Sequence, residues 1–288
     1  MTFRNDYRRA ASFIAEADGL IITAGAGMGV DSGLPNFRGS GGFWRAYPGL
    51  ASASIEFKDI ACPKAFSERP LQAWGFYGHR MNLYRLTPPH QGFFWLRLIG
   101  ESLAKKYFVY TSNVDGQFQK AGFAGDRIVE CHGSIHFLQC CTPCCVKTWS
   151  ADSLDLQINE RNCTVTSPLP ECPRCTGLAR PNVLMFGDSK WEHGRRSVQD
   201  ARYCAWLRKL SNPVVIEIGA GTAIPTCRHE SESAHCAIVR INPEEPEIRT
   251  RGVSLPVGAK EGIFGIVTAL IESGWLNVES LDVLPRSN

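Results

Sequence analysis

Length, composition and charge limit the function classes that this 288-residue chain can belong to. Its length and its apolar content of 44% suffice for one large domain with a proper core, or for one domain that carries a small insert. A net charge of +3 is too mild to predict nucleic-acid binding, which normally requires a concentrated basic stripe. No apolar run approaches the ~18 residues of a membrane span. We therefore expect neither nucleic acid nor a membrane among its partners.

The N-terminus and the cysteines indicate the compartment. Residues 1–19 mix acidic residues with arginines and lack the apolar core of a targeting segment, so they predict an amphipathic helix over 5–17. Twelve cysteines bunch mainly in one region of a chain of ordinary composition. That distribution favours a metal site in a reducing compartment over a secreted disulfide scaffold. We therefore expect a cytoplasmic protein.

Apolar runs typical of buried strands recur along the chain. We predict strands over 19–24, 107–111, 127–132, 182–187, 213–219 and 237–242. The runs are continuous rather than alternating, which is typical of strands buried on both faces of a parallel sheet. Helices are predicted over 91–105, 194–210 and 261–273. This alternation predicts an α/β fold with a Rossmann-like, doubly wound parallel sheet.

Two stretches interrupt the alternation and predict a smaller second domain. Residues 40–90 hold no good strand and are rich in aromatic residues, and residues 136–181 hold most of the clustered cysteines. We expect them to form a small domain with a helical part and a zinc-ribbon part. The larger domain would then consist of residues 1–39, 91–135 and 182–288.

Glycine-rich or polar segments follow every predicted strand. In chain order they read GAGMG, TSNVDG, HGS, GDS, GAGT and RIN. Any one of them could be an ordinary turn. However, the carboxyl ends of parallel strands meet at one edge of the sheet, and open α/β sheets bind their ligands there. The set therefore predicts a single site.

The segment after the first strand is typical of a turn that holds phosphate. Gly25 and Gly27 fit the dinucleotide fingerprint, but Val30 stands where its third glycine is needed, and Pro35 interrupts a regular helix. No acidic residue ends a clear second strand ~20 residues after Gly27. These departures disfavour an NAD(P) dehydrogenase.

The clustered cysteines predict a structural zinc site. CCTPCC at 140–145 and CPRC at 172–175 are two tight groups, and two such groups can complete a tetrahedral site. The first pair is ambiguous among Cys140, Cys141, Cys144 and Cys145, and we take Cys140 and Cys144 with Cys172 and Cys175. A redox role for these pairs is less favoured, because neither opens a helix after a strand. We interpret the six scattered cysteines, at 62, 131, 163, 204, 227 and 236, as small apolar residues.

Taken together, these motifs resemble those of the sirtuins, the NAD-dependent protein deacylases. The resemblance rests on GAGMGVDSGLPNFRG, TSNVDGQFQKAG, HGS with a four-cysteine module, FGD, GAGT and IN, in that order, over residues 10–275. It implies that the larger domain binds NAD and that an acyl-lysine protein or peptide is the substrate. The acyl oxygen would attack C1′ of the nicotinamide ribose, and nicotinamide would leave.

The resemblance also assigns roles to residues. It implies His132 as the catalytic base, with Asn113 and Asp115 as further catalytic residues, and Asp115 as the partner of the nicotinamide carboxamide. The implied NAD-binding residues are Gly25, Ala26, Gly27, Asn36, Phe37, Arg38, Ser112, Asn113, Val114, Asp115, Gly219, Gly221, Thr222 and Asn242. Phe186 and Gly187 of FGD are expected to contact the acylated substrate. A neutral imidazole near pH 7 suits removal of a proton from a ribose hydroxyl.

One pair of residues indicates the acyl group. Class III sirtuins, which remove succinyl, malonyl and glutaryl groups, use a Tyr-x-x-Arg pair, and Tyr77 and Arg80 match that spacing. Residues i and i+3 share a helix face, and a guanidinium offers a planar fork for a carboxylate. The resemblance therefore implies a deacylase for acidic acyl groups. A surface arginine beside a half-buried tyrosine is the plainer interpretation.

Two other functions stay open from the sequence. Protein mono-ADP-ribosyltransfer or NAD hydrolysis would use the same glycine loop and the same histidine. A catalytically weak, zinc-stapled NAD-binding module is the second alternative. Departures from the family pattern favour it, with Gly29 in place of serine and Gln117-Phe118 in place of Leu-His.

Overall fold

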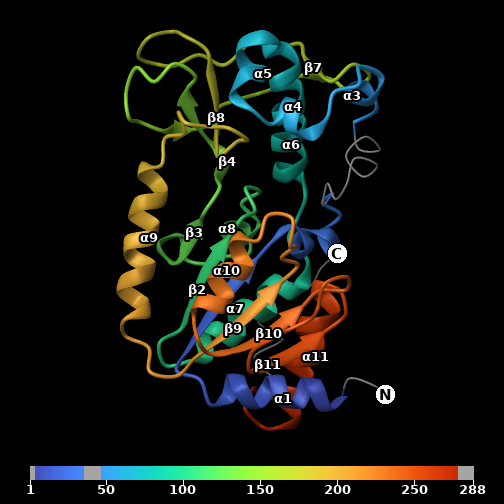
Figure 1. Ribbon diagram of the computed structural model, residues 1–288, viewed down its shortest axis with the longest axis vertical. Helices are drawn as coiled ribbons and strands as arrows, with labels where there is room; N and C mark the ends of the chain where they lie inside the picture. The colour runs from blue at the N-terminus through green and yellow to red at the C-terminus, as the bar shows by residue number, and fades with distance from the viewer. Residues whose placement is uncertain (1–3, 36–46, 278–288) are drawn as a thin grey trace.

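The computed structural model describes residues 4–35 and 47–277, and its largest element is a six-stranded, all-parallel sheet (Figure 1). In spatial order its strands are β11 (Gly252–Leu255), β10 (Ala237–Ile241), β9 (Pro213–Ile218), β1 (Gly19–Ala24), β2 (Tyr107–Thr111) and β3 (Ile128–Glu130). Five of these strands lie where the sequence predicts them. The sixth, β11, was not predicted.

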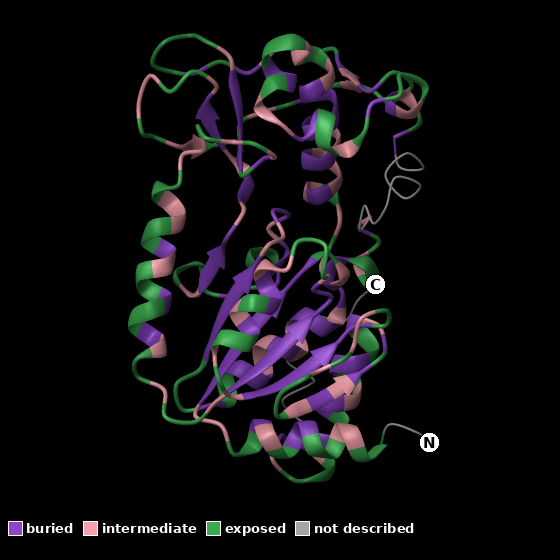
Figure 2. Cartoon of the chain, in the orientation of Figure 1, coloured by how far each residue is buried: buried purple, intermediate pink, exposed green. Residues whose placement is uncertain are grey.

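Helices cover both faces of this sheet, as the continuous apolar runs predict. Leu20, Ile22 and Ala24 of β1 belong to a core cluster with one set of helices, whereas Ile21 belongs to the opposite cluster. The first set is α1 (Arg4–Ala15), α7 (Gln91–Ser102) and α11 (Ala259–Glu272), and the second is α9 (Gly194–Leu207) and α10 (Thr226–Ser233). The strands are accordingly buried, whereas the outer helix faces are exposed (Figure 2). Among the described helices, none combines the length and the apolar content that crossing a membrane requires.

A second, smaller assembly lies beyond one end of the sheet (Figure 1). Its helices are α3 (Pro48–Ser52), α4 (Phe57–Ile60), α5 (Pro63–Glu68) and α6 (Pro70–Leu86). Its strands are β4 (Gly133–Cys140), β5 (Trp149–Ser150) and β8 (Ala179–Val183) in one sheet, with β6 (Ile158–Asn159) and β7 (Thr164–Val165) in a hairpin. The Trp74 indole on α6 donates to the Ala179 carbonyl of β8 at 2.9 Å, which joins the helices to the strands.

One predicted strand does not belong where the sequence puts it. The run at 182–187 predicts a strand of the parallel sheet, but the strand there is β8, which ends at Val183 and pairs antiparallel with β4. This prediction is wrong because an apolar run indicates burial without indicating which sheet buries it. Val183 and Met185 pack instead into the core cluster of the smaller assembly.

The order of the parallel strands creates a crevice. Numbered among themselves in chain order, the six strands lie 3-2-1-4-5-6, so the connections leave β1 and β9 in opposite directions. Open α/β sheets bind ligands at such a switch point, beyond the carboxyl ends of the strands. The segments after β1 and β9 are the two glycine-rich ones, GAGMG and GAGT.

Candidate active site

The glycine turn is fitted to the end of β9 by close backbone contact. The Gly25 N–H donates to the Ile218 carbonyl at 2.9 Å, and the Gly27 N–H donates to the Gly219 carbonyl at 3.1 Å. A Cβ on Gly27 would lie 2.6 Å from the Gly219 Cα, and Gly219 itself has a φ of 58°. Only glycine fits such an approach. The 3₁₀ helix η1 (Ala26–Ser32) continues from this turn.

Hydrogen bonds hold Asn113, after β2, against the same turn. The Thr111 hydroxyl donates to the Ala24 carbonyl at 2.9 Å and accepts the Asn113 N–H at 3.0 Å. The Asn113 side-chain amide donates to the Gly25 carbonyl at 2.9 Å. The ends of β1 and β2 are therefore joined, and the orientation of the Asn113 side chain is fixed.

Asp115 is a buried carboxyl group on the next turn, before the short helix α8 (Gln117–Lys120). The residue is 7% exposed, and its Oδ1 accepts the Gln117 N–H at 2.9 Å. Burial raises the pKa of this carboxyl to about 6, and the nearby Glu130 carboxylate raises it further, whereas the hydrogen bond and the charges of Arg80 and Lys120 lower it. The group can therefore change its charge at mildly acidic pH.

His132 follows β3 and faces the start of α10. Its Nε2 lies 3.4 Å from the Thr226 Oγ1. Burial lowers the pKa of this imidazole below its usual value of 6.5, the Arg196 charge lowers it further, and a hydrogen bond with the Ser112 backbone opposes the shift. The imidazole is therefore neutral at pH 7 and can accept a proton. The sequence did not point to Thr226, which follows the GAGTAIP stretch at 219–225 and begins α10.

One cavity of about 920 Å³ connects these strand ends with α6. The sequence-predicted residues that line it are Gly25, Ala26, Tyr77, Arg80, Ser112, Asn113, Val114, Asp115, His132, Phe186, Gly219, Gly221 and Thr222. Gly27, Gly187 and Asn242 are not among its lining residues. Asn36, Phe37 and Arg38 lie outside the described residues, so their predicted roles are not placed. The volume is of the size that holds a ligand with several rings.

Asn242 lies behind the cavity wall and shapes it. The residue is fully buried, its amide donates to the Ala220 carbonyl at 2.9 Å, and its Oδ1 accepts the N–H groups of Glu244 and Glu245. The Glu245 carboxylate in turn accepts from the Thr222 N–H at 3.0 Å and from the Thr222 hydroxyl at 2.6 Å. The sequence did not indicate Glu244 or Glu245, which both line the cavity.

The opposite wall is formed by α6. Tyr77 and Arg80 both line the cavity, as their spacing on a helix predicts, and the Arg80 guanidinium carbon lies 6.0 Å from the Tyr77 ring centroid. The hydrogen bonds of Arg80 also reach a residue that the sequence did not single out. Its Nε and Nη2 donate to the Tyr84 Oη at 2.9 and 2.7 Å.

The FGD segment carries Phe186 into the cavity on a loop held by a buried ion pair. Both guanidinium Nη atoms of Arg180 donate to the two Asp188 oxygens, at 2.7 and 2.8 Å. The two side chains are 1% and 0% exposed. A bidentate pair of this kind fixes both the distance and the orientation of its partners. The loop from β8 to Asp188 is therefore rigidly anchored.

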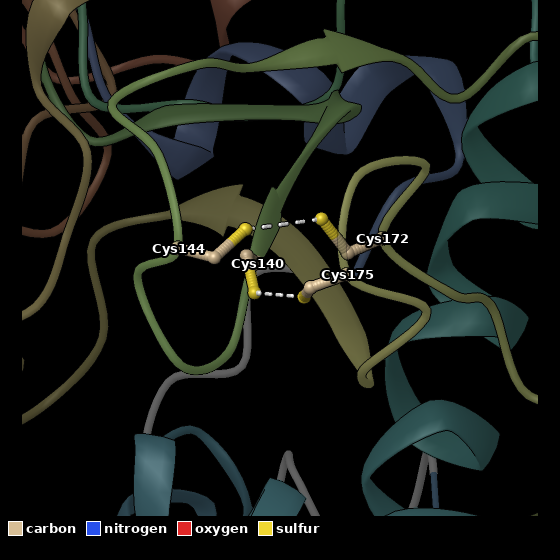
Figure 3. A group of neighbouring side chains, drawn as sticks. All are labelled: Cys140, Cys144, Cys172 and Cys175. Atoms are coloured by element: carbon tan, nitrogen blue, oxygen red, sulfur yellow. Dashed lines mark hydrogen bonds between the residues drawn. The ribbon is translucent and has the colours of Figure 1, made fainter.

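The four predicted zinc ligands gather into one cluster (Figure 3). Their Sγ atoms all lie within 4.8 Å of one another, with 3.7 Å between Cys140 and Cys175 and 3.5 Å between Cys144 and Cys172. Tetrahedral zinc with bonds of about 2.3 Å separates its sulfur ligands by about 3.8 Å. The geometry therefore fits zinc, and the cysteines of the first group that lie in the cluster are Cys140 and Cys144.

All twelve cysteines are free thiols. Among the scattered ones, Cys131, Cys163 and Cys227 are buried, as expected of small apolar residues, and Cys227 also lines the cavity. Cys204 is exposed, so the interpretation as a buried apolar residue is wrong there. It lies on the outer face of α9, which packs against the sheet through Tyr203 and Trp206.

Comparison with known proteins agrees with this arrangement. The model of the Sir2 family matches residues 25–211. A protein of Aquifex aeolicus named NAD-dependent protein deacylase is 28% identical over 236 residues, which cover 80% of this chain and 85% of that protein. Its Thermococcus sibiricus namesake is 33% identical over 181 residues, covering 62% of this chain and 64% of that protein. A canine protein named NAD-dependent protein deacylase sirtuin-5, mitochondrial, is 29% identical over 199 residues, which cover 64% of this chain and 60% of that protein. The chain thus spans less than two thirds of the last two relatives.

Solved structures share the whole fold. A mutant of a Sir2 homologue in complex with ADP-ribose superposes with a TM-score of 0.71 at 25% identity, over 94% of this chain and 98% of that one. A Sir2 homologue–NAD complex superposes with a TM-score of 0.69 at 24% identity, over 92% and 94%. The likeness therefore includes both the parallel sheet and the smaller assembly.

Proposed function

The chain belongs to the Sir2 family, and on that premise we propose that it is an NAD-dependent protein lysine deacylase. It would transfer an acyl group from lysine to ADP-ribose and release nicotinamide. Curated relatives named NAD-dependent protein deacylase support the proposal. So does the resemblance of its long motifs to those of the sirtuins.

One observation carries the proposal. A neutral histidine, a buried carboxyl group and a glycine turn line a single cavity at the switch point of the sheet. His132, Asp115 and Gly25 come from the ends of three different strands, so only the folded chain brings them together. A base beside a dinucleotide-sized cavity is the arrangement that proton transfer from a bound ribose requires.

Each side chain would have a distinct task. NAD, when bound, supplies an ADP-ribosyl group that the acyl oxygen can attack as nicotinamide leaves. Asp115 would accept a hydrogen bond from the carboxamide of the nicotinamide, which its ionised form does best. His132 would take the proton of a ribose hydroxyl at its Nε2, the nitrogen that faces Thr226. Asn113, Val114 and the two glycine turns would hold the ribose and phosphates and exclude water.

The proposal extends to the kind of acyl group that is removed from lysine. We propose an acidic acyl group, such as succinyl, because Tyr77 and Arg80 lie on the cavity wall in the Tyr-x-x-Arg spacing of class III sirtuins. Arg80 is 9% exposed, so its guanidinium lies in a region of low dielectric, where its attraction for a carboxylate is stronger than in water. Phe186 would pack beside the acylated lysine.

Domain boundaries, zinc and compartment complete the proposal. We propose that residues 1–39, 91–135 and 182–288 form the NAD-binding domain, and that residues 40–90 and 136–181 form the small domain. Separate hydrophobic clusters for the sheet and for the smaller assembly support two domains, although Val183 and Met185, just beyond the proposed boundary at 181, pack with the smaller one. Zinc on the four thiolates would hold the small domain together without contacting substrate. Twelve free thiols favour a reducing compartment such as the cytoplasm.

A product assay tests the function. Matched acetyl-lysine and succinyl-lysine peptides are incubated with NAD and the protein, and nicotinamide and O-acyl-ADP-ribose are quantified. We expect peptide-dependent nicotinamide release with O-acyl-ADP-ribose, faster with the succinyl peptide. The His132→Ala variant should lose at least ~100-fold of this activity, the usual contribution of a general base.

The other outcomes each favour a different function. Nicotinamide release that is independent of both peptides would indicate an NAD hydrolase or an ADP-ribosyltransferase, and free ADP-ribose or modified protein would tell these two apart. NAD binding without any nicotinamide release would indicate an NAD-binding module and would refute the catalytic assignment of His132.

A further inference from the structure

Tyr84 stands at the centre of the polar contacts on the α6 wall of the cavity. It lies one helical turn after Arg80, so the two side chains share a helix face. Tyr84 is 4% exposed, and its ring lines the same cavity as Tyr77 and Arg80. Both Nε and Nη2 of Arg80 donate to its single hydroxyl oxygen, at 2.9 and 2.7 Å.

The two hydrogen bonds determine what the Tyr84 hydroxyl can still do. A phenol oxygen has two acceptor lone pairs and one proton to donate. Because Arg80 takes both lone pairs, the proton must point away from the guanidinium. Within residues 4–35 and 47–277, no acceptor lies within hydrogen-bonding distance of the Tyr84 hydroxyl. The wall therefore presents a buried donor to the cavity.

The chemistry of this donor favours an anionic ligand group. Burial raises the pKa of Tyr84 above its usual value, the Asp115 charge raises it further, and the Arg80 charge opposes the shift, so the hydroxyl keeps its proton. A phenol that accepts from a cation is also polarised and becomes a stronger donor. An apolar acyl chain would leave this donor unsatisfied, whereas a carboxylate would satisfy it.

We propose that Tyr84 is a specificity-determining residue that selects acyl groups ending in a carboxylate. It fixes the guanidinium of Arg80 through its lone pairs and donates its own proton to the acyl carboxylate. This inference rests on the proposed deacylase function and deepens it, because the Tyr-x-x-Arg spacing alone does not include Tyr84. The site would thus use two phenols and one guanidinium.

Removal of one oxygen atom tests the proposal. In Tyr84→Phe we expect kcat/KM for the succinyl-lysine peptide to fall roughly tenfold, mainly through a higher KM, because one hydrogen bond to a charged group is lost. Turnover of the acetyl-lysine peptide should stay within about twofold, since that acyl group has no carboxylate. Tyr203→Phe is the matched control. It removes a buried phenol that donates to Glu230 on the far side of the sheet and does not line the cavity, so it should leave the ratio of the two peptides unchanged.

The outcomes separate the two proposals. If wild-type protein turns over neither peptide, the deacylase function fails. If it turns over both and Tyr84→Phe changes them equally or not at all, the function stands and the role of Tyr84 is refuted. If Tyr84→Phe does not fold, as judged by thermal unfolding, Tyr84→His replaces it, because a neutral imidazole can accept from Arg80 and still donate. Succinyl preference kept in Tyr84→His supports the proposal, and preference lost overturns it.

Discussion

A single carboxyl group shows how burial prepares a residue for function. Asp115 is held by a backbone hydrogen bond and lies near both a carboxylate, Glu130, and two cations, Arg80 and Lys120. Burial is the largest of these influences, so the neutral form is favoured up to about pH 6. The ionised form of Asp115 binds a carboxamide best, but ionising this buried carboxyl lowers the stability of the folded protein.

This cost predicts a pH dependence of stability. Between the usual pKa of 3.8 and the folded value of about 6, the folded protein keeps the proton that the unfolded chain has lost. The free energy of unfolding should therefore fall as the pH rises through this window, by up to about 3 kcal/mol. Asp115→Asn cannot ionise, so it should be more stable than wild type at pH 7 and equally stable near pH 4. Chemical denaturation at each pH measures the difference, and parallel pH curves would contradict the prediction. The variant should also lose nicotinamide release.

At the scale of one element, the segment from β8 to Asp188 shows how the small assembly reaches the cavity. The strand pairs with β4, and the chain then turns so that Phe186 lines the cavity. The turn is closed by the buried pair of Arg180 and Asp188, and the Met185 N–H also points to the Asp188 carboxylate at 3.4 Å. The placement of Phe186 therefore depends on a charge pair that does not itself line the cavity.

Breaking that pair should be costly. Asp188→Ala leaves the Arg180 guanidinium buried without its carboxylate, and we expect a loss of roughly 3–5 kcal/mol in the free energy of unfolding. Asp200→Ala removes a half-exposed partner of Arg196 on α9 and should cost less than about 1 kcal/mol. Urea denaturation of the two variants compares them directly. Equal losses would mean that the buried pair does not anchor the loop.

At the scale of the whole molecule, two hydrophobic clusters of different kinds share one ligand cavity. The cluster around the parallel sheet is supplied by long strands and helices, whereas the smaller assembly contains strands of only two residues beside longer β4 and β8. Short strands bury little surface for each residue that they order. Zinc on the four thiolates would offset that deficit by joining residues 140–144 to residues 172–175.

Metal removal should therefore act on one part of the molecule. We expect a zinc chelator to increase hydrogen exchange over residues 136–181 while the parallel sheet stays protected, and to abolish deacylation until zinc is restored. Cys175→Ser should lower the zinc content, measured by elemental analysis. Cys204→Ser, at an exposed thiol outside the cluster, should bind one zinc like wild type. Exchange that rises uniformly over the whole chain would argue against separate stabilisation.

Features that depend on local chemistry could be predicted from the sequence, whereas features that depend on packing could not. Burial on both faces made the parallel strands recognisable, and cysteine spacing indicated the metal cluster. The 182–187 run was assigned to the wrong sheet because its apolar residues are buried by the small cluster. The short strand β11 alternates between partly and fully buried residues and gave no continuous run. Tyr84 and Glu245 escaped notice because their contacts depend on side-chain directions that no spacing encodes.

The position of β1 has a consequence during synthesis. Of the six strands of the sheet it is the first to be synthesised, yet it lies in the middle of the finished sheet, with Gly19 beside Pro213 of β9. Until most of the chain has been translated, the apolar GLIITA strand can pair along one edge only. An unpaired apolar edge is a template for association with other chains. We therefore expect the half-formed sheet to associate with other chains more readily than the finished one does.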